Sequence, residues 1–273
     1  MGKQMLFPEE VGDGRVDTLI KAFSVLTESS GSETVIDWSH TTTVTPAGLG
    51  IAACLFDTIV EQKCAVKSIG IDRKLRGYTP IENLLSVKKH KALPKPQIHN
   101  FEDRQTILRG VESSIDLSFP DLVENHFKNK VDEEPLDAAR LIINELMVNC
   151  VDHSGAERYY LYAGLRDPFL HVGVLDMGIS IPAKLSQKYR FESDELYLLS
   201  ALKKGISTRR TRTGGMGLYY MTELLKENEG RLTIISRDSS VRRYFRRRRT
   251  VSTKLKHRLA GTWCFARIRL NNK

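Results

Sequence analysis

One predicted helix constrains this chain more than any other segment, because its two faces differ in character. The apolar positions recur at helical spacing and form a stripe that a core can bury: Ala139, Ile142, Ile143, Leu146 and Cys150. Glu145, Asn149 and His153 follow one another at four-residue intervals and therefore lie in one row. That row can be an ordinary polar surface. It can also form a site, because a carboxylate can orient a water molecule and an amide oxygen suits Mg²⁺.

Two later turns bear on that choice. Residues 170–175 read as a buried strand that runs into Asp176, with Gly178 two residues later. An Asp there can accept a hydrogen bond from the exocyclic amine of a purine, and glycine lets the backbone approach a ligand. A second turn, rich in glycine, precedes a helix predicted over residues 218–225, and exposed amides at a helix N-terminus suit phosphate. Each turn alone is better explained as a tight connection, but their order and spacing together favour a ligand site.

In this order and spacing, the three segments resemble the ATP-binding domain of the GHKL superfamily, which includes histidine kinases, DNA gyrase B, Hsp90 chaperones, MutL repair proteins and anti-sigma-factor serine kinases. The resemblance covers roughly residues 115–273, and the run from Gly261 looks like the family's closing G-T-x-F-x-I-x-L strand. It implies a Bergerat-type α/β sandwich that binds ATP and Mg²⁺. Glu145 would be the catalytic residue, and Asn149 would bind the nucleotide and Mg²⁺.

The resemblance implies further nucleotide contacts. They are His153, Asp176, Gly178, Ile181, Lys203, Arg209, Thr213, Gly214, Gly215, Met216, Gly217, Leu218 and Thr262. Residues 183–213 correspond to the family's mobile lid, in which residues 193–204 read as a helix and residues 207–213 as a basic loop. The loop could compensate phosphate charge or simply be solvated. Ser180 departs from the family, because it replaces the second glycine of the D-x-G-x-G box.

The first part of the chain, residues 1–96, predicts a second domain. Residues 33–39 read as a strand, a helical pattern begins at Ile51, and residues 65–71 read as another strand, which gives a β-loop-α-β order. With its G-L-G run before the helix, this part resembles the STAS fold of anti-sigma-factor antagonists. Ala47 stands where that family has its phosphorylatable serine, so control by phosphorylation at that position is not expected.

The boundary between the two predicted domains follows residues 88–96, whose lysines and prolines indicate an extended link. The second domain, residues 97–273, opens with residues 101–130, which mix polar and apolar positions and read as a connecting helix and the start of the ATP-binding fold. Each half is long enough to bury its own core. The expected fold class is therefore α/β (α+β), with a STAS-like βαβ domain before a Bergerat-type sandwich.

The basic charge of the chain is concentrated near its end. The formal net charge is +9, yet residues 239–273 carry twelve Lys or Arg and no acid. The densest stretch, Arg242–Arg249, lies in a hairpin or loop predicted over residues 237–258. Arginines interleaved with aromatic residues could bind nucleic acid, but such a loop could also meet an acidic protein or a membrane surface, or remain solvated.

Other sequence features indicate the cellular compartment of the protein. The sequence contains no apolar run long enough to span a bilayer and no signal-peptide pattern, so we expect a cytoplasmic protein. The four cysteines lack metal-ligand spacing, and we expect reduced, mostly buried thiols.

No histidine lies in a phosphoacceptor motif, which argues against a full histidine kinase. The leading hypothesis is a Mg²⁺-dependent ATPase. The alternatives are a regulatory protein that binds a protein partner according to nucleotide state, with or without serine/threonine kinase activity, and an ATP-gated nucleic-acid binder. The resemblance also makes a homodimer an expectation.

Overall fold

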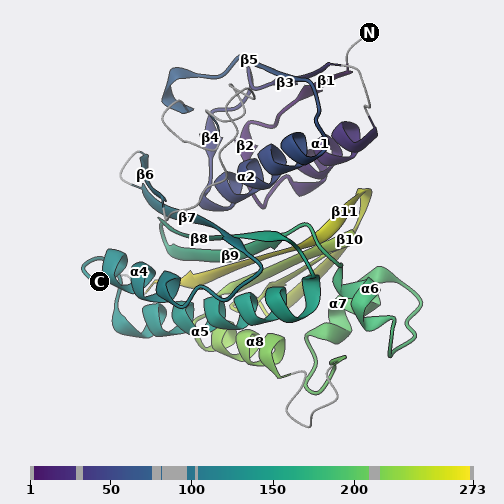
Figure 1. Ribbon diagram of the computed structural model, residues 1–273. Coiled ribbons are helices and arrows are strands. Elements are labelled where there is room, and N and C mark those ends of the chain that lie inside the picture. Colours follow the sequence, from purple (N-terminus) through teal and green to yellow (C-terminus); the bar gives the residue numbers. More distant parts are fainter. Residues whose placement is uncertain are drawn as a thin grey trace.

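The computed structural model describes residues 3–28, 33–75, 81, 97–101, 104–208 and 216–270, and gives only the backbone for 97–101, 104 and 105. The fold is mixed α/β, as the sequence predicts. Its centre is a six-stranded antiparallel sheet with the order β10-β11-β9-β8-β7-β6 (Figure 1). The strand bounds are β6 Gln97–Phe101, β7 Arg104–Glu112, β8 Arg158–Arg166, β9 Phe169–Asp176, β10 Arg231–Tyr244 and β11 Arg249–Arg269.

The sheet confirms the strand predicted at residues 170–175, which is β9, and the hairpin predicted around the basic segment, which is β10–β11. The prediction of a connecting helix at the start of residues 101–130 is wrong. That stretch begins within strands β6 and β7, and a helix appears only afterwards, as α4 (Ser118–Phe127). These two strands lie at the β6 edge of the sheet, and the sequence of this stretch has no clear period.

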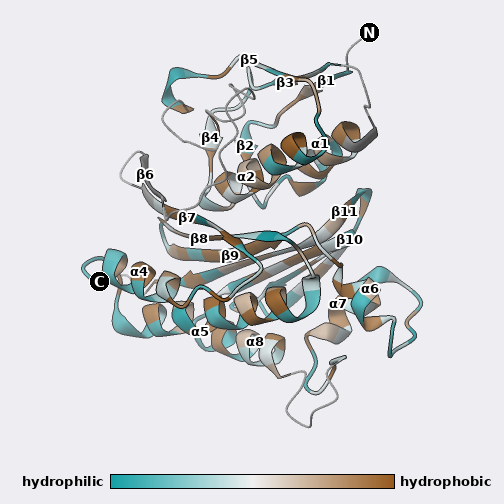
Figure 2. Ribbon diagram, in the orientation of Figure 1, coloured by the Kyte–Doolittle hydropathy of each residue, from teal (hydrophilic) through white to brown (hydrophobic). Residues whose placement is uncertain are grey.

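Helices α4, α5 (Glu133–Asn149) and α8 (Gly217–Glu227) cover one face of the sheet (Figure 1). The apolar stripe of α5 is buried against the strands, as predicted. Helices α6 (Ile181–Leu185) and α7 (Asp194–Ala201) lie beside this layer, and α7 packs against β10. Figure 2 shows apolar segments along the strands and on the helices that cover them. The predicted helices over residues 193–204 and 218–225 are thus confirmed as α7 and α8.

The N-terminal unit, residues 3–81, contains the predicted β-loop-α-β pattern. Its parallel sheet has the order β1-β3-β5, and a second pair of strands, β2 and β4, also runs parallel. The bounds are β1 Lys3–Leu6, β2 Glu10–Val11, α1 Val16–Glu28, β3 Thr34–Asp37, β4 Thr43–Val44, α2 Pro46–Glu61, β5 Val66–Ile69 and the 3₁₀ turn Arg73–Leu75. Helix α2 starts where Thr45 accepts a hydrogen bond from Gly48 N at 3.1 Å and Pro46 occupies the first turn.

Helices α1 and α2 pack against the second face of the central sheet (Figure 1), α1 on β11 and α2 on β8 and β9. One apolar core therefore runs through the N-terminal unit and into the sheet. Its sheet residues include Tyr162, Leu175, Leu259, Trp263 and Phe265. The second half has a core of its own on the opposite face of the sheet, whereas the core of the N-terminal unit is shared with apolar residues of the sheet. The link predicted at residues 88–96 lies outside the described residues.

Buried charge fixes the N-terminal unit to the sheet. Asp13 is 1% exposed, and its carboxylate lies 2.5 Å from Arg267 and 3.8 Å from Arg231. Burial would raise the pKa of this carboxyl, but the Arg267 and Arg231 guanidinium groups outweigh it and hold the pKa below the usual 3.8. Two more ion pairs cross the same boundary, Glu10–Arg166 at 2.6 Å and Asp57–Arg158 at 3.4 Å.

Part of the predicted basic segment is used inside the molecule. Arg242 donates to the backbone oxygen of Asp13 at 2.8 Å, and Arg246 lies 3.6 Å from Glu229. Phe245 N donates to Gly230 O at 3.1 Å, so the second half of β10 folds back beside its first half. The arginine row is therefore not one continuous exposed surface.

Within the described part of the chain, no helix has both the length and the apolar character that a bilayer crossing demands. The four cysteines are free; Cys54, Cys150 and Cys264 are buried and Cys64 is partly buried. This confirms the predicted free, mostly buried thiols.

We predict that Asp13→Ala lowers the free energy of unfolding by about 3–5 kcal/mol at pH 7, because it leaves buried guanidinium groups without their carboxylate. Urea denaturation would measure the loss. Asp121→Ala is the matched control: Asp121 forms an exposed ion pair with Arg140, and its loss should cost about 0–1 kcal/mol. Because the folded-state pKa of Asp13 is depressed, its contribution should be present above pH 4 and decline as the pH falls below it. Equal losses for the two variants would contradict this account.

Candidate functional site

A cavity of about 290 Å³ lies between α5, the end of β9, α6, the start of α8 and β11. It brings together predicted site residues from four separate segments of the chain. Those that line it are Glu145, Asn149, His153, Asp176, Ile181, Met216, Gly217, Leu218 and Thr262. Its volume is near the lower end of the range of small-molecule sites, roughly 300–1,000 Å³.

The polar row on α5 lines the cavity and continues into the turn that ends the helix. After Asn149 the chain forms a π-helical turn, Cys150–Ser154, and ends at Gly155 in the left-handed region with φ 58°. His153 lies in this turn and lines the cavity. Asn149 Nδ2 donates to Glu145 Oε1 at 3.3 Å, which leaves the amide oxygen as the Asn149 atom that could bind a cation.

The start of α8 lies directly on the Glu145 carboxylate. A Cβ at Gly217 would come within 1.4 Å of Glu145 Oε1, so a larger residue there would displace the Glu145 carboxylate. This close approach sets the backbone of the first turn of α8 beside the carboxylate. Glycine at this position is therefore explained by steric proximity to Glu145.

Asp176 is a buried acid that lines the cavity. It is 5% exposed, and its Oδ1 accepts a hydrogen bond from Gly178 N at 2.9 Å. Burial raises the pKa of Asp176 to about 7, although hydrogen bonds from the Gly178 and Thr262 backbones oppose the shift. Gly178 does not line the cavity. A Cβ there would lie 2.3 Å from Ser154 O, so this glycine lets the Asp176 turn pack against the π-helical turn.

Ser236 connects three segments around the cavity, a role that no sequence pattern indicated. Its hydroxyl donates to Gly261 O at 2.9 Å, lies 2.9 Å from the Thr262 hydroxyl and accepts from Ile181 N at 3.1 Å. Ser236 is completely buried on β10. It thereby holds Thr262 in place and joins the start of α6 to the central sheet.

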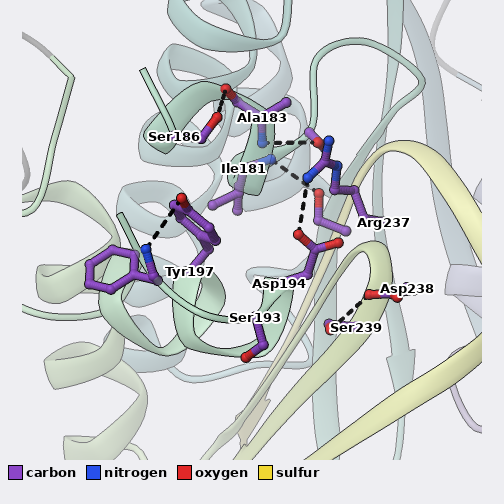
Figure 3. Close-up of polar contacts among 12 residues, drawn as sticks. Ile181, Ala183, Ser186, Ser193, Asp194, Tyr197, Arg237, Asp238 and Ser239 are labelled. Atoms are coloured by element: carbon purple, nitrogen blue, oxygen red, sulfur yellow. Dashed lines mark hydrogen bonds and ion pairs between the residues drawn. The ribbon is translucent and has the colours of Figure 1, made fainter. Parts of the chain in front are cut away.

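The segment after Asp176 has ordered contacts of its own. Ser180, in place of the family's glycine, has an ordinary φ of −67° and caps α6 by accepting from Ala183 N at 3.3 Å. Arg237 forms an ion pair with Asp194 at the start of α7 (Figure 3), and the two charged groups lie 3.1 Å apart. A small apolar cluster joins the two helices and contains Leu185, Tyr197 and Ala201. Because the φ of Ser180 is ordinary, the serine in place of glycine causes no backbone strain at this turn.

The sequence analysis predicted two basic residues for the site, Lys203 and Arg209. Lys203 is exposed and does not line the cavity, although Ala201 before it and residues 206–208 after it do. Arg209, Thr213, Gly214 and Gly215 lie outside the described residues. Lys184, which sequence reasoning missed, does line the cavity. Its position three residues after Ile181 in the same helical turn was the available signal.

Several apolar or small residues of the cavity wall were also missed. They are Leu146, Cys150, Ser154, Val174, Ile179, Leu185, Tyr220, Ile234 and Cys264. In sequence, most of them are indistinguishable from core positions. Among the described residues, no group of three or more His, Cys, Asp or Glu side chains could hold a metal ion alone. A cation here would need other ligands besides Glu145 and Asn149.

No protein-family model matches this chain, and a comparison with curated proteins finds no match.

We predict that Asp176→Asn raises the melting temperature at pH 8 and has a much smaller effect at pH 5. The folded-state pKa of about 7 exceeds the usual 3.8, so the folded chain binds a proton that the unfolded chain lacks between these values. Wild-type stability should therefore fall as the pH rises through this window, and the asparagine removes the buried charge responsible. Thermal unfolding at both pH values measures this. An equal shift at pH 5 and pH 8 would contradict it.

Proposed function

We propose that the cavity binds ATP together with Mg²⁺ and that the chain is a Mg²⁺-dependent ATPase. One observation carries this proposal: four segments that resemble the boxes of the GHKL ATP-binding domain converge on one cavity, on the face of an antiparallel sheet that α4, α5 and α8 cover. The cavity combines a buried carboxylate, a carboxylate–amide pair and the start of a helix. These groups suit, in turn, the purine base, the Mg²⁺ ion and the phosphates of ATP.

The purine end is assigned to Asp176. Its buried carboxylate can accept a hydrogen bond from the exocyclic amine of adenine, and Val174 and Ile234 offer apolar surface beside it. Thr262, held by Ser236, adds a hydroxyl at this end. A donor on the ligand would favour the ionised form of Asp176 and lower its raised pKa.

The phosphate end is assigned to the start of α8 and to Lys184. Backbone amides at a helix N-terminus attract anions, and Lys184 supplies positive charge in a cavity that also contains two acids. The Asn149 amide oxygen fits Mg²⁺, which would retain waters and phosphate oxygens as its other ligands. When bound, the metal ion would neutralise charge on the phosphates.

Hydrolysis is assigned to Glu145. Its carboxylate lies between Asn149 and Gly217, where it can orient a water molecule and take its proton as the water oxygen attacks the γ-phosphorus. The bond from that phosphorus to the bridging oxygen would break, so that ADP and phosphate leave. Transfer of the phosphoryl group from ATP to a hydroxyl of the N-terminal unit is not favoured, because that unit covers the sheet face away from the α5 and α8 helices (Figure 1). The Thr45 hydroxyl is also buried as the cap of α2.

The regulatory part of the proposal concerns the segment from α6 to α7. This segment forms one wall of the cavity and contacts β10 through Arg237, so occupancy of the cavity can change its position relative to the hairpin. A protein partner that recognises this segment would then sense the nucleotide. The partner and the homodimer stay predictions.

We predict that Glu145→Ala lowers ATP hydrolysis at least about a hundredfold and leaves the Kd for ATP within about threefold, because the carboxylate acts on water. Phosphate release and a binding titration with Mg²⁺ would be measured on the same preparation. Glu134→Ala, at an exposed position of the same helix, is the control and should hydrolyse ATP normally. An unchanged rate in Glu145→Ala would sink the catalytic assignment, whereas a wild-type chain that binds no ATP would sink the whole proposal.

We also predict that Asn149→Ala weakens ATP binding when Mg²⁺ is present and has little effect in EDTA, because the amide oxygen is lost as a metal ligand. The ratio of the two dissociation constants is the quantity to measure. A loss of the same size with and without Mg²⁺ would assign Asn149 to nucleotide contact or to the positioning of Glu145 instead.

A further inference from the structure

The two sides of β9 face different partners at the point where the strand reaches the cavity. Val174 and Asp176 line the cavity. Leu175, between them, is fully buried in the core that the sheet shares with the N-terminal unit, and Met177 packs against the same core. Asp176 is therefore flanked on both sides by residues whose position depends on the N-terminal unit.

Helix α2 contacts Leu175 through its backbone. A Cβ at Gly50 would come 2.7 Å from Leu175 Cδ1 and 3.5 Å from Tyr162 Cδ1, so the helix lies directly on these side chains. Helices approach other elements this closely only where glycine removes the side chain. Leu175 has no room to move toward α2.

Helix α2 is itself fixed to the neighbouring strand. Tyr160 pairs with Leu175 across β8 and β9, and its hydroxyl donates to the Asp57 carboxylate of α2. Arg158, two residues earlier on β8, lies 3.4 Å from the same carboxylate. A polar anchor at Asp57 and an apolar contact at Gly50 thus hold the helix against the two strands that carry the Asp176 turn.

We propose that helix α2 of the N-terminal unit positions Asp176, so that Gly50 and Leu175 are positioning residues for purine recognition in the cavity on the opposite side of the sheet. This inference rests on the proposed function for its ligand. Leu175 and Asp176 are neighbours in β9, and their side chains lie on opposite faces of the sheet. Because both faces are tightly packed, a displacement of Leu175 also moves Asp176. The N-terminal unit then acts as a fixed part of the binding site.

The test enlarges Gly50. Gly50→Val should push Leu175 away from α2, weaken ATP binding about tenfold and reduce the preference for ATP over ITP, which lacks the exocyclic amine. Gly50→Val combined with Leu175→Ala makes room for the added side chain and should restore the preference. Loss of selectivity with rescue by the second change would not follow from general destabilisation.

Ile59→Ala is the matched control. Ile59 is a fully buried residue of α2, and helix geometry places it about 13 Å along the axis from Gly50 and on the other side. The control should lose stability but keep the preference for ATP over ITP. A Gly50→Val chain with unchanged selectivity, or a control that loses selectivity equally, would overturn the inference.

Hydrogen exchange on the ligand-free chain separates this inference from the proposed function. The Gly178 amide is bonded to the Asp176 carboxylate, so Gly50→Val should speed its exchange and the Leu175→Ala second change should slow it again. This readout needs no nucleotide. If the wild-type chain binds no ATP but the variants show these changes in exchange, the proposed function is rejected and the positioning role is kept. If Gly50→Val leaves the exchange of the Gly178 amide unchanged, the positioning role alone is rejected.

Discussion

The burial of both faces of the central sheet is the constraint on which the rest of the structure depends. Strand β9 is buried along almost its whole length, with residues on one side in contact with α5 and residues on the other in the core shared with α1 and α2. An antiparallel sheet can leave one face to solvent, but this one carries large apolar residues on both. The N-terminal unit is therefore required to cover apolar surface, and the Asp13–Arg267 contact adds a buried ion pair to that packing.

The same constraint explains why a cavity survives in so densely packed a molecule. Apolar contacts fill the centre of the sheet, while the cavity lies where β9 ends beside Thr262 of β11 and α5 widens into its π-helical turn. Polar groups collect there because strand ends and helix ends leave backbone donors and acceptors outside the regular pattern. Gly217, Gly178 and Gly261 allow these ends to come within contact distance, as their lack of space for a Cβ shows.

Local patterns in the sequence were sufficient for much of this arrangement. The α5 stripe, β9 and the β10–β11 hairpin could be predicted because each carries its own periodicity or charge pattern, and the predicted polar residues from four segments do line one cavity. Strands β6 and β7 were missed because this stretch of sequence has no clear period, and their place in the sheet depends on the pairing of β7 with β8, far along the chain. Ser236 and the Gly50–Leu175 contact could not be predicted, since both depend on distances between segments far apart in the chain. Lys203 shows the converse: its charge suggested a role that its exposed position does not support.

The capping of α6 has a mechanical consequence. Ser180 fixes the first turn of this helix and Ser236 ties Ile181 to the sheet, so the chain is anchored as far as Leu185. Beyond it, α7 is held to the sheet by the buried Leu198 and by the partly exposed Arg237–Asp194 pair. Any hinge in this segment must therefore lie after α6. The cavity wall formed by Asp176 and Thr262 would stay rigid while the wall beyond α6 opens or closes, so one end of the cavity can recognise its ligand before the other end has taken its final shape.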